Sequence, residues 1–160
     1  MKSVLFRPAC ALLPLALAAI SAPAAAADDS VASRLDSQSM KYKVDEDGDY
    51  RVTYNYKKEG RSQLVFVSGS TESVNGMTIR EIFSPAADMS KDDVNGKAVS
   101  LLKESGRTKI GAWEVRGTVL YFVVKAPEPM TAAQLEGFMD MAASKADDME
   151  IEISGSRDSL

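Results

Sequence analysis

The side chains that most often carry catalysis and metal binding are almost missing from this sequence. Its 160 residues include no histidine, and the single cysteine is Cys10. The commonest general base, the commonest zinc ligand and the thiolate nucleophile therefore lack their residues. No serine stands in a G-x-S-x-G motif, and no glycines cluster into a phosphate-binding loop. We therefore expect a protein that is not an enzyme and that holds no cofactor and no metal.

Carboxylates are the remaining groups for acid–base chemistry. Two pairs, Asp92-Asp93 and Asp147-Asp148, fall on predicted helices. Neighbouring residues in a helix do not share one face, so neither pair forms an acid–base couple by itself. A hydrolase that uses carboxylates alone is the enzymatic alternative.

The acidic run Asp45–Asp49 has the composition of a calcium loop. An EF-hand loop needs glycine at its sixth position and glutamate at its twelfth. Here Gly48 falls at the fourth position and Tyr56 at the twelfth. An acidic hairpin turn is the preferred interpretation, and a weak surface calcium site is the alternative.

Four of the five tyrosines fall in one predicted hairpin: Tyr42, Tyr50, Tyr54 and Tyr56. Tyrosine offers a large contact area with a polar tip, so the four are candidate binding residues for a peptide or a sugar. Such residues are more often cross-strand packing pairs, and we prefer this interpretation because Val52 lies on the same predicted face and must be covered.

Residues 1–27 have the three parts of a secretory signal peptide. Lys2 and Arg7 supply the positive start, Ala9–Ile20 is a short apolar stretch, and Ala25–Ala27 is an A-x-A cleavage site. The apolar stretch is shorter than the ~20 residues that a membrane span needs. We expect cleavage after Ala27, no membrane span afterwards, and a periplasmic or secreted protein. An uncleaved N-terminal anchor is the alternative.

Charge and length narrow the class further. The formal net charge is −4 at pH 7, and losing Lys2 and Arg7 with the signal peptide makes the rest more acidic. No basic stripe is visible in the sequence, so we expect no nucleic-acid partner. The remaining length suits one hydrophobic core, which predicts a single domain over residues 28–155 and a flexible tail over residues 156–160.

The C-terminal third predicts strand, tight turn, strand and helix. A strand carries Ile110, Trp113 and Val115, and the apolar run Val119–Val124 predicts a central strand that Pro127 and Pro129 end. Thr131 followed by Gln134 predicts a capping box at the start of a long helix. Trp113 is expected to be buried. The helix has an apolar stripe that is also expected to be buried, formed by Leu135, Phe138, Met139, Ala142, Ala146 and Met149.

The upstream part predicts two helices and four strands. A first helix is expected over Val31–Met40, and the strands fall at residues 42–44, 50–56, 64–67 and 77–83. Turns at Asp47-Gly48 and Asn75-Gly76 and a stop at Pro85 separate them. Ser90, with Asp93, is the predicted N-cap of a second helix that Gly106 ends. Its buried side is expected to hold four residues: Val94, Ala98, Leu101 and Leu102. The predicted order is α-β-β-β-β-α-β-β-α.

Three motifs give this order a family resemblance. They are the turn Asp47–Tyr50, the strand start Lys109–Trp113, and the helix from Thr131 through Ala146-Asp147 to Glu150. With these motifs, Tyr42–Gly155 resembles the YbjN-like domain, a bacterial family whose fold is similar to type III secretion chaperones. The resemblance implies an α+β domain with a curved antiparallel sheet of about six strands flanked by helices. It implies no catalytic residues.

Together these features predict a non-enzymatic periplasmic protein-binding or chaperone-like module of the YbjN-like type. A structural or regulatory envelope protein that acts through self-dimerisation is the alternative. Two strands are apolar on both faces, but the two longer helices can cover only one face. We therefore expect some of the apolar strand residues to lack cover by a helix and to contact a second copy or a protein partner. The candidates are Val65, Val67, Leu120, Phe122 and Val124. Sheet curvature and the tyrosine hairpin could instead hide that face.

Overall fold

The structure is a computed structural model that describes residues 30–155 and residue 158. The predicted signal peptide over residues 1–27 lies outside the described residues. Of the predicted tail, only Asp158 lies within them, and its carboxylate accepts hydrogen bonds from Ser62 N (3.1 Å) and Ser62 Oγ (3.3 Å). The described residues contain no helix that is both long and apolar enough to cross a membrane.

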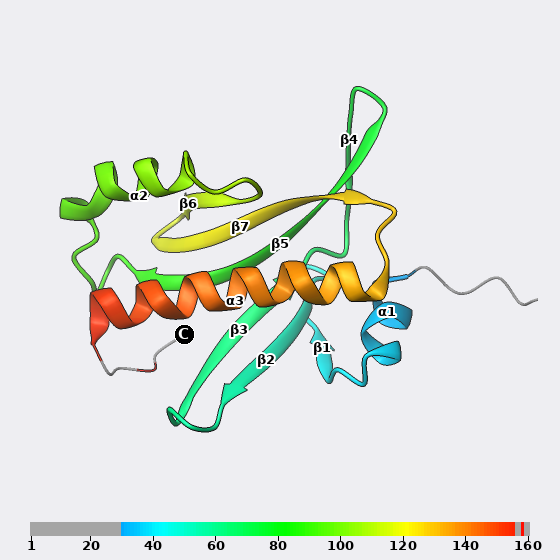
Figure 1. The fold of residues 1–160 in the computed structure, drawn as a ribbon, viewed down its shortest axis with the longest axis horizontal. Coiled ribbons are helices and arrows are strands. Elements are labelled where there is room, and N and C mark those ends of the chain that lie inside the picture. Colours follow the sequence, from blue (N-terminus) through cyan, green and yellow to red (C-terminus); the bar gives the residue numbers. More distant parts are fainter. Residues whose placement is uncertain (1–29, 156–157, 159–160) are drawn as a thin grey trace, which may run out of the picture.

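One antiparallel sheet organises the fold (Figure 1). Its seven strands are β1 (Tyr42–Val44), β2 (Tyr50–Tyr56), β3 (Arg61–Val67), β4 (Glu72–Val74), β5 (Met77–Asp88), β6 (Ala112–Arg116) and β7 (Val119–Glu128). The order across the sheet is β1-β2-β3-β5-β7-β6, and β4 pairs with β5 off this path. The α+β class and the antiparallel sheet flanked by helices are confirmed. The sheet gains one strand over the prediction because the residues before the Asn75-Gly76 turn form β4.

The helices pack on one face of this sheet, called here the helical face. The helices are α1 (Val31–Ser37), α2 (Ala98–Ser105), which follows the 3-10 turn Asn95–Lys97, and α3 (Ala132–Ser154). The long α3 crosses in front of the sheet in Figure 1 and packs on β3, β5 and β7. The shorter α1 packs against α3, and α2 packs against β6. The opposite side of the sheet is called the open face.

The core lies between α3 and the helical face. Strand register places Val52 beside Val65, and Val67 beside Ile82, which in turn pairs with Val124. All five side chains are at most 4 % exposed. Apolar residues of α3 close the core from above, all at most 1 % exposed: Leu135, Met139, Ala142, Ala143 and Ala146.

The prediction of under-covered residues is wrong in its choice of face. Val65, Val67, Leu120, Phe122 and Val124 are each at most 1 % exposed. Successive strand residues point to opposite faces, so a single layer of helices covers only every second residue. The apolar residues without a helix above them are the alternates on the open face: Leu64, Phe66, Phe83 and Tyr121, all half-buried.

Both strands predicted to end at proline continue through it. β7 includes Pro127, which pairs with Ile79 of β5. The pairing of β6 with β7 stops at Val123, so at Pro127 the strand has a neighbour on one side only and the missing N–H costs no ladder bond. β5 passes Pro85 with a register irregularity between Pro85 and Ala87, which accommodates the ring.

The helix starts were predicted with mixed success. The capping box of α3 is confirmed, with Gln134 N 3.2 Å from Thr131 Oγ1 and Thr131 N 2.8 Å from Gln134 Oε1. The second helix does not begin at Ser90, because the Ser90 N–H and hydroxyl both donate to Asp88 Oδ1. It begins at Ala98, without a side-chain cap. Gly106 follows its last residue with a right-handed backbone rather than the left-handed C′ conformation.

Buried ion pairs fasten the helices to the sheet. Arg61 of β3 donates to two α3 carboxylates, Asp147 Oδ1 at 2.9 Å and Glu150 Oε2 at 2.8 Å. Glu128 at the end of β7 accepts from Arg34 of α1 at 3.0 Å and from Arg80 of β5 at 2.6 Å. No sequence motif predicts either cluster, since each joins residues far apart in the chain.

Candidate interaction site

The second helix is only partly used by the core. Leu101 is 6 % exposed and packs into it, whereas Val99 and Leu102 are 65 % and 71 % exposed. Ala98 and Leu102 were predicted to be buried, and both predictions are wrong because both residues are exposed. Adjacent residues of an α-helix point in directions about 100° apart, so Leu102 turns away from the sheet when Leu101 faces it. The strand beside it also shows an apolar side chain to solvent, since Val115 of β6 is 56 % exposed.

An apolar groove lies between α2 and the β6–β7 hairpin. It has a volume of about 250 Å³. Eight residues line it: Met89, Val94, Ala98, Leu101, Leu102, Trp113, Val115 and Leu120. Their side chains are hydrocarbon, thioether or indole, and the indole N–H is already bonded outside the groove to Glu104. The groove therefore suits an apolar side chain rather than a charged ligand.

The outer edge of β6 borders this groove. β6 ends the strand order and pairs only with β7. The Trp113 N–H donates to Ser105 Oγ of α2 at 2.9 Å, so it points away from β7. Backbone direction alternates along an antiparallel strand, so the N–H and C=O of Val115 point to the same outer side. No described strand pairs with them, which leaves a donor and an acceptor beside the groove.

A polar joint fixes α2 over the edge of the sheet. Glu104 accepts from Trp113 Nε1 at 3.1 Å and from Lys145 Nζ of α3 at 2.8 Å. Burial alone would raise the pKa of Glu104, but the hydrogen bonds from Lys145 and Trp113 outweigh it and hold the pKa below its ordinary value. The joint therefore carries a charged carboxylate at neutral pH and positions the wall of the groove.

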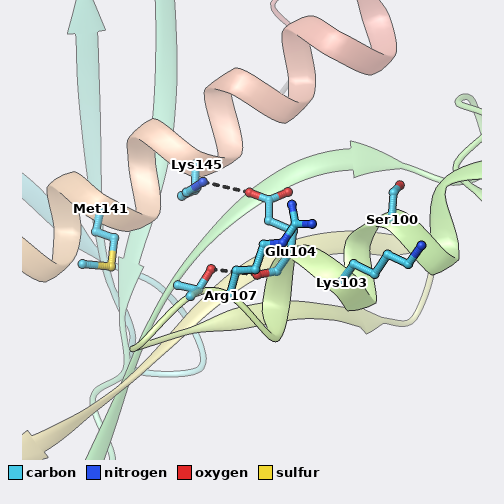
Figure 2. Close-up of a pocket in the computed structure, with 7 residues that line it drawn as sticks. Ser100, Lys103, Glu104, Arg107, Met141 and Lys145 are labelled. Atoms are coloured by element: carbon cyan, nitrogen blue, oxygen red, sulfur yellow. Dashed lines mark hydrogen bonds and ion pairs between the residues drawn. The ribbon is translucent and has the colours of Figure 1, made fainter.

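A shallow polar depression lies on the other side of α2. Figure 2 shows Glu104 pointing toward Lys145 across it, with Lys103 and Arg107 at its rim. The one serine that lines it, Ser100, donates its hydroxyl to the Lys97 carbonyl oxygen at 2.7 Å. No nucleophile lies beside a base here among the described residues, and the central carboxylate is occupied by its ion pair.

The four candidate tyrosines lie at the opposite edge of the sheet from the groove. Tyr42 and Tyr50 have ring centroids 5.4 Å apart, and with Tyr54 they pack against the core. Burial and then the neighbouring Asp140 carboxylate raise the pKa of Tyr54. Tyr56 is half-buried on the same face. Packing accounts for these positions, and a binding role for the four tyrosines stays a prediction.

The acidic turn uses its carboxylates on the backbone. Asp45 Oδ1 accepts from Asp47 N at 3.1 Å and from Asp49 N at 2.9 Å. Asp49 Oδ1 accepts from Gly69 N at 3.0 Å. Within residues 30–155 and 158, no group of three acidic side chains gathers where it could hold a metal ion. The hairpin-turn interpretation therefore accounts for these residues.

Comparison with known proteins adds no assignment. A scan against protein-family models finds no matching family, and a search of curated proteins finds no match. The resemblance to the YbjN-like domain therefore stays a prediction.

Proposed function

We propose that this protein is a non-enzymatic binding module that captures an extended apolar segment of another polypeptide at the outer edge of β6. The observation that carries this proposal is the adjacency of two features. The unpaired N–H and C=O of Val115 lie beside an apolar groove whose walls include the exposed Leu102. An added strand gains main-chain hydrogen bonds from such an edge and places a side chain in the adjoining pocket.

Two of the features that protect edge strands, a proline and a bulge, are missing from β6. Edge strands are commonly blocked by proline, by a bulge or by charges that face the incoming strand. β6 contains no proline and pairs with β7 without a register shift. Together with the predicted signal peptide, this supports a module that acts on proteins in the periplasm.

Site-specific photocrosslinking tests the proposal in cells. A benzophenone amino acid at position 102 or 115 is expected to capture a partner polypeptide. The same group at Ser144, an exposed residue of α3, is the matched control and is expected to capture none. Equal capture at all three positions would contradict a specific site.

A backbone substitution tests the mode of binding. The Val115 N–H points away from β7, so Val115→Pro removes it without breaking a ladder bond. Capture at position 102 is expected to disappear in this variant and to persist in Val115→Thr, which keeps the N–H. Circular dichroism checks that both variants fold. Undiminished capture by Val115→Pro would exclude strand addition.

Self-association through the same edge is a second candidate, and the β6 sequence favours it. Two copies paired antiparallel about Val115 would place Glu114 of one copy opposite Arg116 of the other. Opposite charges at such positions favour pairing and like charges oppose it. A dimer seen by light scattering should therefore weaken with Glu114→Arg alone and recover when Arg116→Glu is added. A strictly monomeric protein over micromolar concentrations would exclude this candidate.

A further inference from the structure

A single row of side chains crosses the open face of the sheet from edge to edge. Strand register pairs Lys43 with Arg51, Arg51 with Phe66, Phe66 with Phe83, and Phe83 with Val123. Paired residues of antiparallel strands share a face, so all five lie on the open face. The row runs from basic residues at the β1 edge to apolar residues at the centre of the sheet.

The centre of this row is an aromatic cluster. The Phe66 and Phe83 rings are stacked, with centroids 5.2 Å apart and planes inclined by 7°. Tyr121 meets Phe83 edge-on at 5.7 Å, and the Arg116 guanidinium lies 5.1 Å from the Phe83 centroid. These rings pack face to face and edge to face, and each is half-buried. Together they form one apolar cluster on the open face.

The two ends of the open face differ in charge balance. Toward β6, Arg116 pairs with Glu81 and Glu114 at 2.9 Å each, and Lys125 pairs with Glu114 at 2.9 Å. This end is neutral as a group. Its charges are therefore compensated within the chain, and it offers no net attraction to a charged ligand.

The β1 end carries basic side chains that form no ion pair, beside an acidic turn whose Asp45 and Asp49 carboxylates bond to backbone N–H groups. Lys43 lies directly opposite Arg51, and these two residues line a shallow depression on the open face together with Lys41. No ion pair joins any of the three to a described residue. Like charges directly opposite each other on a sheet are destabilising. The arrangement is unfavourable for the isolated fold and favourable for an anionic ligand, in a chain whose formal net charge is −4.

We propose that the β1 half of the open face binds an extended acidic segment of a partner protein. Carboxylates of the segment lie against Lys43 and Arg51, and its apolar side chains lie on Phe66 and Phe83. This surface is separate from the outer edge of β6, because it lies on the other face and toward the other edge of the sheet. The proposal therefore does not depend on the function proposed above.

The mixture of charge and apolar surface selects this occupant over other anions. A nucleic acid carries a negative charge at every nucleotide, so the net negative charge of the whole chain opposes it more strongly than a short segment with a few carboxylates. An anionic membrane would need fully exposed apolar side chains to enter the lipid, whereas these rings are half-buried against one another. An acidic segment with alternating apolar residues matches both parts of the row.

Fluorescence anisotropy with two labelled peptides tests the proposal. One peptide alternates glutamate with phenylalanine and the other alternates lysine with phenylalanine. The purified protein is expected to bind the first in preference to the second, and added salt is expected to weaken this binding because the charges are near the surface. Binding of both peptides with equal affinity would overturn the proposal. So would binding of phosphatidylglycerol vesicles or heparin without binding of the acidic peptide.

Charge reversal on the row supplies the sharpest variant. Lys43→Glu is expected to weaken the binding of the acidic peptide by about tenfold, equivalent to about 1.4 kcal/mol. Its unfolding free energy should not fall, because the introduced carboxylate faces Arg51 and replaces a repulsive pair by an attractive one. Lys58→Glu makes the same charge change in the exposed β2–β3 turn and is expected to leave binding unchanged. Equal loss in both variants, or no loss in Lys43→Glu, would overturn the proposal.

Discussion

Buried charge at Glu128 shows how single residues hold this fold together. The carboxylate accepts from Arg34 and Arg80, and also from Met130 N at 3.0 Å. Burial alone would raise the pKa of Glu128, but the hydrogen bonds from the two arginines outweigh it and lower the pKa below the ordinary 4.5. One residue thereby joins α1, β5 and the end of β7.

Removing this charge should destabilise the protein strongly. Glu128→Gln keeps the volume but leaves two arginines around a neutral group, which typically costs about 3–5 kcal/mol. Urea unfolding at neutral pH measures this loss. Glu152→Gln is the matched control, because Glu152 is 60 % exposed in its pair with Lys97 and should cost below about 1 kcal/mol. Equal losses in the two variants would contradict the proposed role of burial.

The same carboxylate predicts a pH dependence. A carboxyl group with a lowered pKa in the folded state stabilises the protein above its ordinary pKa, and this contribution is lost as the pH falls through the folded value. The unfolding free energy of the parent protein should therefore decline below the ordinary pKa of 4.5. Glu128→Gln should show a shallower decline over the same range, because this contribution is already missing. Parallel pH profiles for the two proteins would show that other groups dominate.

Sequence reasoning could not find these contacts, for a definite reason. Arg61 lies 86 residues from Asp147 and 89 from Glu150, so no local spacing connects them. The direct opposition of Lys43 and Arg51 is likewise seen only in the register of β1 and β2. The sequence shows only that the charged residues are spread along the chain. The pairing of the strands decides which of them lie next to one another.

At the scale of elements, the sequence predicted correctly those features that depend only on neighbouring residues. The capping box at Thr131 and the turns at Gly48 and Gly76, where φ is 86° and 81°, are as the sequence indicates. The start of α2 and the passage of β7 through Pro127 depend on tertiary neighbours, and both were predicted wrongly. For β7, the deciding neighbour is the short β6, which leaves one side of Pro127 free.

The cap of α3 is a local feature with a measurable effect. Thr131→Ala should cost about 1 kcal/mol, because the Gln134 N–H loses its acceptor and the reciprocal bond to Gln134 is no longer held. Chemical denaturation measures the change. Ser144→Ala, at an exposed position in the middle of α3, is the control and should be neutral or slightly stabilising. A larger effect at Ser144 than at Thr131 would contradict the capping interpretation.

The apolar residues of α3 are not all buried to the extent that the sequence predicts. Phe138 is only half-buried at the side of the core, whereas Met139 is 0 % exposed beneath the helix. Met139→Ala should therefore cost about 2–5 kcal/mol, and Phe138→Ala should cost less despite the larger side chain. Urea midpoints of the two variants give the ranking. A greater loss for Phe138→Ala would place that ring deeper in the core than the structure does.

At the scale of the whole molecule, one layer of helices on one sheet explains where free surface remains. The helical face is filled by α3 and by the two shorter helices at its ends (Figure 1). The open face keeps its aromatic cluster half-exposed, and the sheet ends at β6 on one side and at β1 on the other. The sequence indicated that one face would lack cover, but the choice of face needed the strand register.

This architecture separates the two proposed binding surfaces, which leads to a last prediction. The outer edge of β6 and the basic end of the open face lie at opposite edges of the sheet, with β2, β3, β5 and β7 between them. Substitutions at sites that far apart, with no shared partner, are expected to act independently. Lys43→Glu should therefore weaken the binding of the acidic peptide and leave photocrosslinking at position 102 unchanged.

Val115→Pro should have the converse effect. It removes an outward N–H at β6 while the row from Lys43 to Phe83 stays in place, so anisotropy with the acidic peptide should match that of the parent protein. Loss of both activities in either single variant would show that the two surfaces are coupled, through a shared partner or through the sheet itself. Retention of one activity in each variant would instead fix two independent binding surfaces on one small domain.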